Sequence, residues 1–300
     1  MRRTFADKVF DAVNITLLSL ITLAMIYPLW FVIIASFSDI VKVNAGAVTI
    51  WPIGFQTDAY YNVISNNFIW TGYRNSIFYT VSATLYSVAM TLGCSYALSR
   101  PAFRGKGVIN FFFIFTLYFS GGLIPSYLLM KSLKLIDTVW VMILPSGMGV
   151  FNMIITRTFF RTNLPLELYE AAKVDGASEF RFFFTVALPL SGAIIAVMCL
   201  YAGVANWNSW FGGLLYINKP SNYPLGLVLR SILIKFEPVE IETAKSMLTE
   251  EEVRLKVYRE NMAQSMRYAL IFISAAPLLI AYPFVQKYFV KGVLIGSVKG

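Results

Sequence analysis

Residues 161–190 read RTNLPLELYEAAKVDGASEFRFFFTVALPL and form a polar island between two long hydrophobic runs. Pro165 suits the first turn of a helix, where its missing N–H is harmless, and Asn163 is a good capping residue before it. Gly176 can take the left-handed conformation that commonly ends a helix. We therefore predict a short helix over about residues 165–175, roughly 16 Å long at 1.5 Å per residue.

One face of this predicted helix carries small and apolar side chains, because residues three and four positions apart lie together on a helix. The side chains grouped in this way are Leu164, Leu168, Ala171, Ala172 and Asp175. The two alanines would allow another protein to approach the helix closely. After the turn, Ser178 is expected to cap a second short helix.

The composition is that of a membrane protein. Of the 300 residues, 57% are hydrophobic and 14% are charged, whereas a soluble domain carries about 25% charged residues. The net charge of +9 would suggest nucleic acid in a soluble protein, but here we expect it to mark cytoplasmic loops. No aromatic and basic pattern of a nucleic-acid module is present.

Several kinds of catalytic and metal site are excluded by the residues themselves. Histidine is absent, which removes imidazole acid–base catalysis and histidine metal sites. Cys94 and Cys199 lie in separate hydrophobic runs, so we interpret them as small apolar packing residues. The chain has no phosphate-binding loop of the G-x-x-x-x-G-K-[ST] type, and almost no charge lies within the apolar runs, which disfavours proton or sodium coupling. Energy for any transport must come from another protein.

Six apolar runs are each long enough for a transmembrane helix. We predict an all-α membrane protein with a single domain over residues 1–300. The predicted spans cover about residues 15–36, 75–98, 108–130, 139–159, 187–204 and 268–289. Residues 205–265 form an outer loop, within which Thr249 caps a helix over about 250–264, and residues 291–300 form a tail. Pro145, Gly147 and Gly149 predict a bend in the fourth span.

The basic residues set the expected orientation. The first span lacks a convincing cleavage site and is interpreted as uncleaved, with both chain termini in the cytoplasm. The predicted inner segments carry Arg2, Arg3, Lys8, Arg100, Arg104, Lys106, Arg157, Arg161, Lys173, Arg181, Lys287, Lys291 and Lys299. The short outer loops carry fewer basic residues, and five tryptophans fall on the outer side, where an aromatic belt is expected.

The second span is rich in hydroxyl groups, which suit either close helix packing or a water-filled path. These side chains are Ser76, Thr80, Ser82, Thr84, Ser87, Thr91 and Ser95. The sequence favours packing over path lining without deciding between them.

A family resemblance rests on three elements of the 161–190 segment. Glu170-Ala171-Ala172, then Gly176, then Val186-x-Leu188-Pro189 is similar to the EAA loop of ABC-importer permeases, with Val186 where isoleucine is usual. The surrounding spans also resemble the six-helix permeases of carbohydrate importers, the type I fold. The resemblance implies a coupling helix that docks on a cytoplasmic ATPase. The residues implied in coupling are Leu168, Glu170, Ala171, Ala172, Asp175, Gly176 and Pro189. The alternative is an ordinary amphipathic surface helix.

The resemblance also implies how this helix works. It would convert closure of the ATPase into movement of the fourth and fifth spans, with Glu170 fixing the helix through a hydrogen bond or salt bridge. Enlarging Ala171 or Ala172 should then hinder docking without unfolding the membrane part.

Two further segments resemble parts of maltose-type permeases. The tail ending in Gly296, Ser297, Val298, Lys299 and Gly300 is similar to a tail that contacts the ATPase subunits; the alternative is a frayed end. The segment with Trp207, Asn208 and Trp210 is similar to a loop that reaches the solute-binding protein. We expect residues 206–230 and the helix over 250–264 to form this docking surface, although that charged helix equally suits a solvated cap.

The stretch Tyr282–Gly292 is similar to a branch of oligosaccharide permeases that includes importers of oligogalacturonate, rhamnogalacturonan and alginate fragments. Candidate residues of the sugar path are Tyr79, Tyr86, Tyr118, Asn152 and Asn206. The resemblance implies a bacterial cytoplasmic membrane protein with four kinds of partner besides the lipid bilayer: a second homologous permease, two ATPases that carry ATP and Mg, a solute-binding protein and an oligosaccharide. No cofactor, metal or nucleic acid is expected on this chain. A passive channel and a non-transport polytopic membrane protein, such as a polytopic enzyme, are the alternatives.

Overall fold

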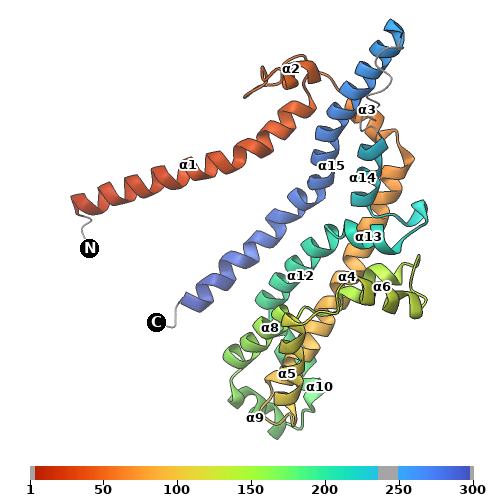
Figure 1. Ribbon diagram of the computed structural model, residues 1–300. Helices are drawn as coiled ribbons and strands as arrows, with labels where there is room; N and C mark the ends of the chain where they lie inside the picture. Colours follow the sequence, from red (N-terminus) through yellow and green to blue (C-terminus); the bar gives the residue numbers. More distant parts are fainter. Residues whose placement is uncertain (1–3, 236–248, 298–300) are drawn as a thin grey trace. The chain divides into compact units, whose positions relative to one another are not determined.

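The computed structural model describes residues 4–235 and 249–297, and the regular structure within these ranges is helical (Figure 1). The prediction of an all-α protein is therefore confirmed. The chain divides into two compact units. Unit 1 comprises Met1–Ile69 with Leu229–Pro277, and unit 2 comprises Trp70–Val228 with Leu278–Gly300.

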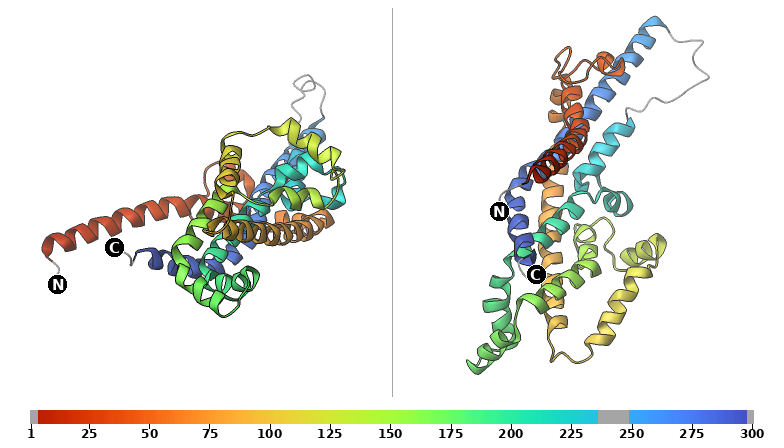
Figure 2. Two further views of the ribbon diagram at one scale, coloured as in Figure 1. Left: turned by 90° about the horizontal axis from the view of Figure 1, so that it is seen from below. Right: turned by 90° about the vertical axis from the view of Figure 1, so that its left-hand side faces the viewer.

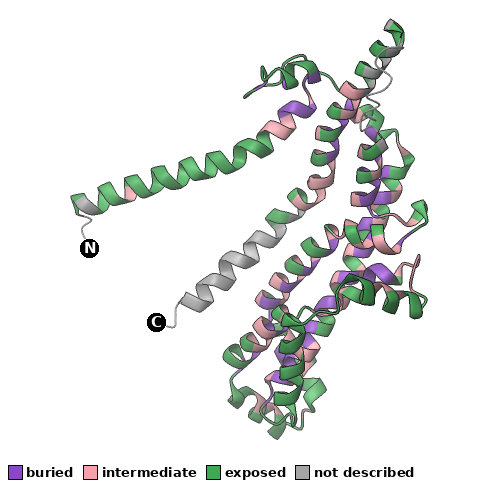
Figure 3. Cartoon of the chain, viewed as in Figure 1, coloured by how far each residue is buried: buried purple, intermediate pink, exposed green. Residues whose placement is uncertain are grey.

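Unit 1 begins with the long helix α1 (Phe5–Ser36), which both views of Figure 2 draw as one continuous helix. Thr4 caps it, since its side chain accepts a hydrogen bond from the Asp7 N–H while the Asp7 side chain accepts from the Thr4 N–H. Most of α1 is exposed in Figure 3. An apolar helix with this exposure is suited to a lipid environment.

A small apolar cluster forms at the last turns of α1. Helices α2 (Ile40–Asn44) and α3 (Asp58–Ile64) follow it. The small core cluster of this unit consists of Ile34, Ala35, Ile40, Val43 and Val48, with Phe31 and Tyr268 packed against it. The rings of Phe31 and Tyr268 meet edge to face at 6.3 Å.

Helix α15 (Glu250–Ser297) corrects the predicted boundaries at the C-terminal end. We expected an outer helix over about 250–264 and a separate span over about 268–289, but both lie in one 48-residue helix. Helix formers continue without a glycine or proline between the two predicted elements, so nothing interrupts the backbone hydrogen bonds. The helix also takes in most of the predicted tail, while Val298, Lys299 and Gly300 lie outside the described residues.

Unit 2 contains most of α4 and the helices that follow it (Figure 1). Their bounds are α4 (Asn67–Ser99), α5 (Lys106–Tyr118), α6 (Leu123–Ser132), α7 (Trp140–Ile143), η1 (Leu144–Ser146), α8 (Val150–Asn163), α9 (Leu166–Val174), α10 (Glu179–Phe182), η2 (Phe183–Ala187), α11 (Leu188–Leu190), α12 (Gly192–Trp207), α13 (Trp210–Tyr216), η3 (Pro220–Asn222) and α14 (Leu225–Lys235). Helix α14 begins in this unit and continues into unit 1.

Three of the predicted spans are bent in the structure. The third span bends by 118° between α5 and α6, the fourth by 48° between η1 and α8, and the fifth by 81° between α11 and α12. The bend predicted in the fourth span from its proline and glycines is confirmed. The 13 residues of α5 extend only about 20 Å, so the third span is not one straight crossing. Among the described residues, three unbroken helices could cross a membrane, or up to six spans if each bent pair is one.

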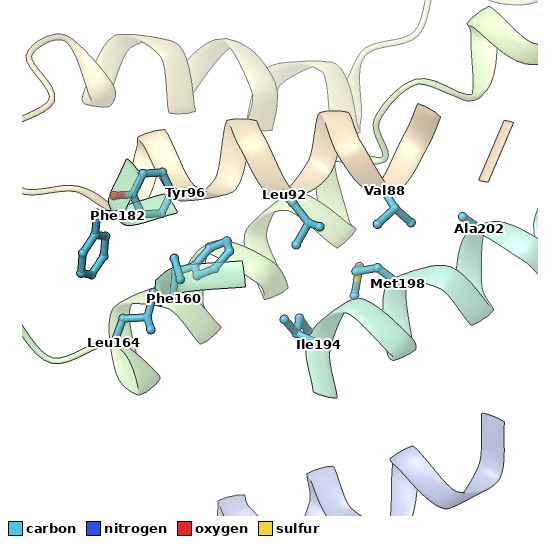
Figure 4. Close-up of a cluster of buried hydrophobic side chains, with 10 residues drawn as sticks. Val88, Leu92, Tyr96, Phe160, Leu164, Phe182, Ile194, Met198 and Ala202 are labelled. Carbon is cyan, nitrogen blue, oxygen red and sulfur yellow. The ribbon is translucent and has the colours of Figure 1, made fainter. Parts of the chain in front are cut away.

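The core of unit 2 joins α4 to α8 and α12. Figure 4 shows Val88 and Leu92 of α4 pointing toward Met198 and Ile194 of α12. Phe160 of α8 belongs to the same cluster. Two serines of the predicted hydroxyl row on α4 form inter-element hydrogen bonds: Ser95 donates to the Met153 carbonyl at 3.0 Å, and Ser76 accepts from the Leu225 N–H at 2.8 Å. These contacts support the packing interpretation of the hydroxyl row.

A carboxylate clasp connects two loops of unit 2 at the end of α12 remote from α9. Asp137 lies in the loop between α6 and α7 and has a φ of +62°. Its Oδ1 accepts hydrogen bonds from the N–H groups of Asn218 (3.1 Å) and Lys219 (3.0 Å), and its Oδ2 lies 3.5 Å from Lys219 Nζ. The backbone hydrogen bond from Lys219 is the main reason that the pKa of Asp137 is lowered, with further help from Asn218 and the Lys219 charge.

Replacement of Phe160 should destabilise unit 2, because this ring is only 2% exposed. We expect Phe160→Ala to lower the free energy of unfolding by about 3 to 5 kcal/mol through the cavity that it leaves. The measurement is thermal unfolding of the detergent-solubilised chain. Phe151→Ala is the matched control on the same helix, since Phe151 is 63% exposed. An equal loss in both variants would contradict this account of the core.

The clasp should weaken in acid. Because the pKa of Asp137 is lower in the folded chain than the ordinary value near 3.9, its stabilisation is fully present above about pH 4 and is lost as the pH falls through the lowered pKa. The protection of the Asn218 and Lys219 amides against hydrogen exchange, relative to the intrinsic rate at each pH, should therefore fall below about pH 4. Asp137→Ala, which removes the acceptor oxygen, should show this loss of protection already at pH 7, whereas Lys219→Gln, which keeps both backbone donors, should change it less. Full protection in Asp137→Ala would refute the clasp.

Candidate functional site

Helix α9 (Leu166–Val174) occupies most of the predicted 165–175 helix. Its start differs from the prediction. Pro165 is the residue before the helix, with φ −57° and ψ 147°, and no side chain caps the helix. Asn163 is the last residue of α8, and its side-chain amide donates to the Phe159 carbonyl at 3.1 Å. An extended conformation at Pro165 turns the chain between α8 and α9 while keeping the fixed φ of proline.

The end of α9 follows the sequence prediction. Gly176 has a φ of +75°, the left-handed conformation that glycine adopts without strain. The N–H of Ala177 donates to the Ala172 carbonyl at 2.9 Å, which closes the C-terminal turn. Ser178 then caps α10, where its side chain accepts a hydrogen bond from the Arg181 N–H at 3.2 Å. The two short helices are therefore joined by a tight turn.

The two faces of α9 have different environments. Tyr169 and Ala172 pack against the core cluster of unit 2, in which Leu164 is fully included. Leu168 is 42% exposed and Val174 is 88% exposed, and Ala171 between them is also exposed. The prediction that both alanines share an outward face therefore needs correction, because a helix turns by about 100° per residue and places only Ala171 outward.

Glu170 is exposed, and it forms no hydrogen bond or ion pair with the described parts of the chain. The expectation that Glu170 fixes the helix therefore finds no partner within these residues. Asp175 and Pro189 are exposed as well. Figures 1 and 2 show α9 and α10 at the same end of unit 2 as the end of α4 and the start of α5.

Arg100, which the sequence marks only as a basic residue of a predicted inner segment, connects three helices at this end of unit 2. The Arg100 Cζ lies 3.7 Å from the ring centroid of Tyr169, 5.4 Å from that of Phe182 and 5.5 Å from that of Tyr96. Its Nε lies 3.7 Å from Glu179 Oε2. The Arg100 cluster is defined here as Arg100, Tyr96, Tyr169, Glu179 and Phe182. It connects the end of α4 with α9 and with α10.

Glu179 is the acceptor at the centre of this cluster. Its Oε2 accepts from the Tyr96 hydroxyl at 2.9 Å, and its Oε1 accepts from the Tyr169 hydroxyl. The hydrogen bond to Glu179 is the first cause that raises the pKa of Tyr169, because a carboxylate acceptor favours the protonated phenol. Arg100 itself is 9% exposed, and its Nε and Nη2 have no hydrogen-bond partner among the described residues.

A cavity of about 600 Å³ lies beside the Arg100 cluster. Its lining combines aromatic rings with the guanidinium and includes Tyr96, Arg100, Phe103, Phe180, Phe183 and Phe184. The π-helical turn η2 (Phe183–Ala187) forms one side of it. Such turns occur often at functional positions in helices.

The candidate sugar-path residues are dispersed within unit 2. The hydroxyl of buried Tyr79 donates to the Asn222 carbonyl at 3.0 Å, and buried Asn206 accepts at Oδ1 from Ser146 at 2.8 Å. Both therefore hold loops and helices together. Tyr86 lies against Gly147, where an added Cβ would approach Tyr86 Cε1 within 3.2 Å. Tyr118 is exposed and Asn152 is half-buried. These residues do not converge on a described cavity.

The candidate docking residues lie around the junction of α12 and α13. Trp207 ends α12, Asn208 follows it, and Trp210 begins α13. Asn208 is exposed, and its side-chain amide donates to the Val204 carbonyl at 3.0 Å. The two tryptophans are half-buried. Among the tail candidates, Gly296 and Ser297 are the last residues of α15.

The sequence indicates only some of the residues of the Arg100 cluster. Arg100 follows a long span and precedes Pro101, which marks a helix end, and Tyr96 stands four residues before it. Its partners Tyr169 and Glu179 are 69 and 79 residues further along the chain, so no local pattern identifies them.

Comparisons with known proteins agree with this architecture. The family described as "Binding-protein-dependent transport system inner membrane component" matches residues 1–295. Protein LplC of Bacillus subtilis is 39% identical, with 100% of this chain and 98% of the relative covered. The polygalacturonan/rhamnogalacturonan transport system permease protein YtcP of the same organism is 35% identical, with 98% and 99% covered.

A solved structure has the same fold. It is the crystal structure of a bacterial ABC transporter involved in the import of the acidic polysaccharide alginate. The matched chain is 30% identical and gives a TM-score of 0.81, with 95% of this chain and 98% of that chain covered. The chain therefore belongs to the family of binding-protein-dependent transport system inner membrane components, the multi-pass permeases of ABC transporters.

Proposed function

We propose that this permease imports oligosaccharides and that α9 is the coupling helix on which a separate cytoplasmic ATPase docks. The observation that carries the coupling proposal is the exposed apolar face of α9, with Leu168, Ala171 and Val174 turned outward. Exposed apolar groups on a polar connecting segment are a common mark of a protein interface. The face follows the E-A-A and glycine spacing that resembles the EAA loop.

The covalent path from α9 supports transmission into the membrane helices. Helix α8 enters α9 through the two-residue link Leu164-Pro165, and α9 continues through Gly176 into α10, η2, α11 and α12. Leu164 and Ala172 pack in the same core cluster as Phe160 of α8 and Met198 of α12. A displacement of α9 by the ATPase would therefore move both flanking helices, because packed cores transmit strain with little compression.

The orientation and partners in this proposal follow from the charges and the family. Four basic residues lie on α9 and on the helices next to it in sequence, namely Arg157, Arg161, Lys173 and Arg181, and basic loops favour the cytoplasmic side. Binding-protein dependence implies a solute-binding protein on the opposite side. A second, homologous permease and two ATPases complete the proposed assembly, with ATP and Mg bound on the ATPases. Trp207, Asn208 and Trp210 are proposed to contact the binding protein, and the tail residues 296–300 are proposed to contact the ATPases.

Acidic fragments of plant or algal polysaccharides are the proposed substrates. The support comes from the relatives, since one is a polygalacturonan/rhamnogalacturonan permease and another belongs to an alginate importer. A third relative, 26% identical, is the arabinooligosaccharides permease AraQ of Halalkalibacterium halodurans, which widens the proposal to oligosaccharides in general. A passive channel, the competing function, would need neither the exposed face of α9 nor an ATPase.

Enlarging Ala171 should prevent docking of the ATPase. We expect Ala171→Trp to reduce co-purification of the co-expressed ATPase at least tenfold, because the indole would hold the two surfaces apart, while the permease remains folded. Ala205→Trp, an exposed position on α12, is the control and should retain the ATPase. Undiminished assembly of Ala171→Trp would count against α9 as the dock. Ala172→Trp is less informative, because Ala172 packs in the core.

The substrate proposal is tested by uptake in vesicles that contain the assembled importer and its binding protein. We expect ATP-dependent uptake of oligogalacturonides, with maltotriose as the neutral comparison. Uptake should be lost in Ala171→Trp and should require the binding protein. Uptake of maltotriose alone would overturn the acidic class, and uptake that is independent of ATP would favour a channel.

A further inference from the structure

We propose that Arg100 is a positioning residue that latches the coupling helix α9 to the end of α4, so that α4 is a third span moved by the ATPase. This inference rests on the proposed function of α9. It adds a contact that the chain connectivity does not provide, because α4 is separated from α9 by 66 residues of sequence, residues 100–165. The evidence is the geometry of the Arg100 cluster.

Arg100 is fixed where a helix must stop. Helix α4 ends at Ser99, and Pro101 disfavours a helical conformation at the residue before it. The Arg100 N–H donates to the Ala97 carbonyl at 3.2 Å, which satisfies a carbonyl that the end of α4 would leave without a partner, and Lys106 Nζ donates to the carbonyls of Arg100 and Pro101 at 3.4 Å each. The backbone of Arg100 therefore moves with α4, while its side chain extends to α9.

The side chain of Arg100 contacts α9 directly at Tyr169 and indirectly through Glu179 of α10. Its guanidinium lies over Tyr169 at 3.7 Å from the ring centroid, close enough for a cation–π contact. Glu179, which faces Arg100 Nε at 3.7 Å, also accepts the Tyr169 hydroxyl. Tyr169 is thus held at its face by Arg100 and at its hydroxyl by Glu179. Because Glu179 also accepts from the Tyr96 hydroxyl of α4, a displacement of α9 pulls on α4 through both contacts.

The burial of Arg100 argues for a role beyond packing. A buried cation is costly unless it is paired and hydrogen-bonded, and replacing buried ion pairs by apolar groups is often neutral or stabilising. Arg100 is only 9% exposed, and two of its nitrogens lack hydrogen-bond partners among the described residues. The adjacent cavity of about 600 Å³ gives the side chain room to follow α9. A planar guanidinium can slide over a ring and keep its contact, which a lysine ammonium does less well.

The test uses the full chain co-expressed with its ATPase, second permease and binding protein. In Arg100→Gln we expect the α9 amides to exchange hydrogen about five- to tenfold faster, as loss of a desolvated cation–π contact predicts. ATPase co-purification should persist, while the number of oligogalacturonide molecules imported per ATP hydrolysed falls several-fold. Arg100→Lys should recover part of this ratio. Arg104→Gln, an exposed cation of the same loop, is the matched control and should change neither readout.

Tyr169→Leu provides a second route to the same contact, because it removes the ring and leaves the cation. Its effects should match those of Arg100→Gln, and the double variant should be no worse than either single variant. Unchanged α9 exchange in both single variants would overturn the latch, as would additive losses in the double variant. Failure of the wild-type chain to retain the ATPase would instead overturn the proposed function, so the two failures are distinguishable.

Discussion

The end of a long membrane helix creates the constraint on which this end of unit 2 depends. Where α4 stops, its last carbonyl groups need donors, and the negative end of the helix dipole favours cations. The Arg100 N–H donates to the Ala97 carbonyl in the last turn of α4 at 3.2 Å, and the Lys106 ammonium donates to two carbonyls just beyond the helix. The Arg100 side chain extends instead to Glu179 and Tyr169. The residue that ends the helix thus also brings α9 and α10 to α4.

The core of unit 2 explains how a local movement could spread. Phe182, the last residue of α10 before η2, belongs to the same core cluster as Phe160 of α8, while Met198 of α12 faces α4 (Figure 4). These side chains come from each helix that leaves or approaches α9. The π-helical turn at η2 and the 81° bend before α12 interrupt the regular ladder of hydrogen bonds, and such interruptions are the places where a helix changes direction most readily. A rigid cluster therefore adjoins a deformable turn.

Sequence reasoning succeeded where the signal is local. The left-handed Gly176, the Ser178 cap and the short helix before them follow from residue types and spacing alone, and so does the all-helical class. Sequence reasoning failed where the local sequence is compatible with two different conformations. Pro165 is allowed at either the first helical position or the preceding one, and only the turn from α8 decides. Ala172 and Ala171 are chemically identical, so their opposite environments depend on where the core lies.

The larger errors of sequence-based prediction arise in the same way, but from contacts between residues that are far apart in the sequence. Glycine and proline predict that a span is broken, but the 118° bend between α5 and α6 depends on packing that no single segment contains. The Arg100 cluster is formed from three separate segments, and each contributes a residue that is unremarkable alone: a basic residue after a span, a tyrosine on a helix and a glutamate behind a cap. Periodicity and motif spacing carry no information about such partners.

The distribution of charge in unit 2 suggests why electrostatic contacts lie at the ends of its helices. The predicted spans contain very little charge, because an ion inside the hydrocarbon layer is costly, so within the spans the helices are held by packed apolar side chains such as Leu92 and Met198 and by neutral hydrogen bonds such as that from Ser95. At the ends of the spans, where the chain meets water, charged and directional contacts have a smaller free-energy cost. The Asp137 clasp joins loops at one end, and the Arg100 cluster joins helices at the other. Unit 2 is therefore held by apolar packing along its predicted spans and by charged, directional contacts at the ends of its helices.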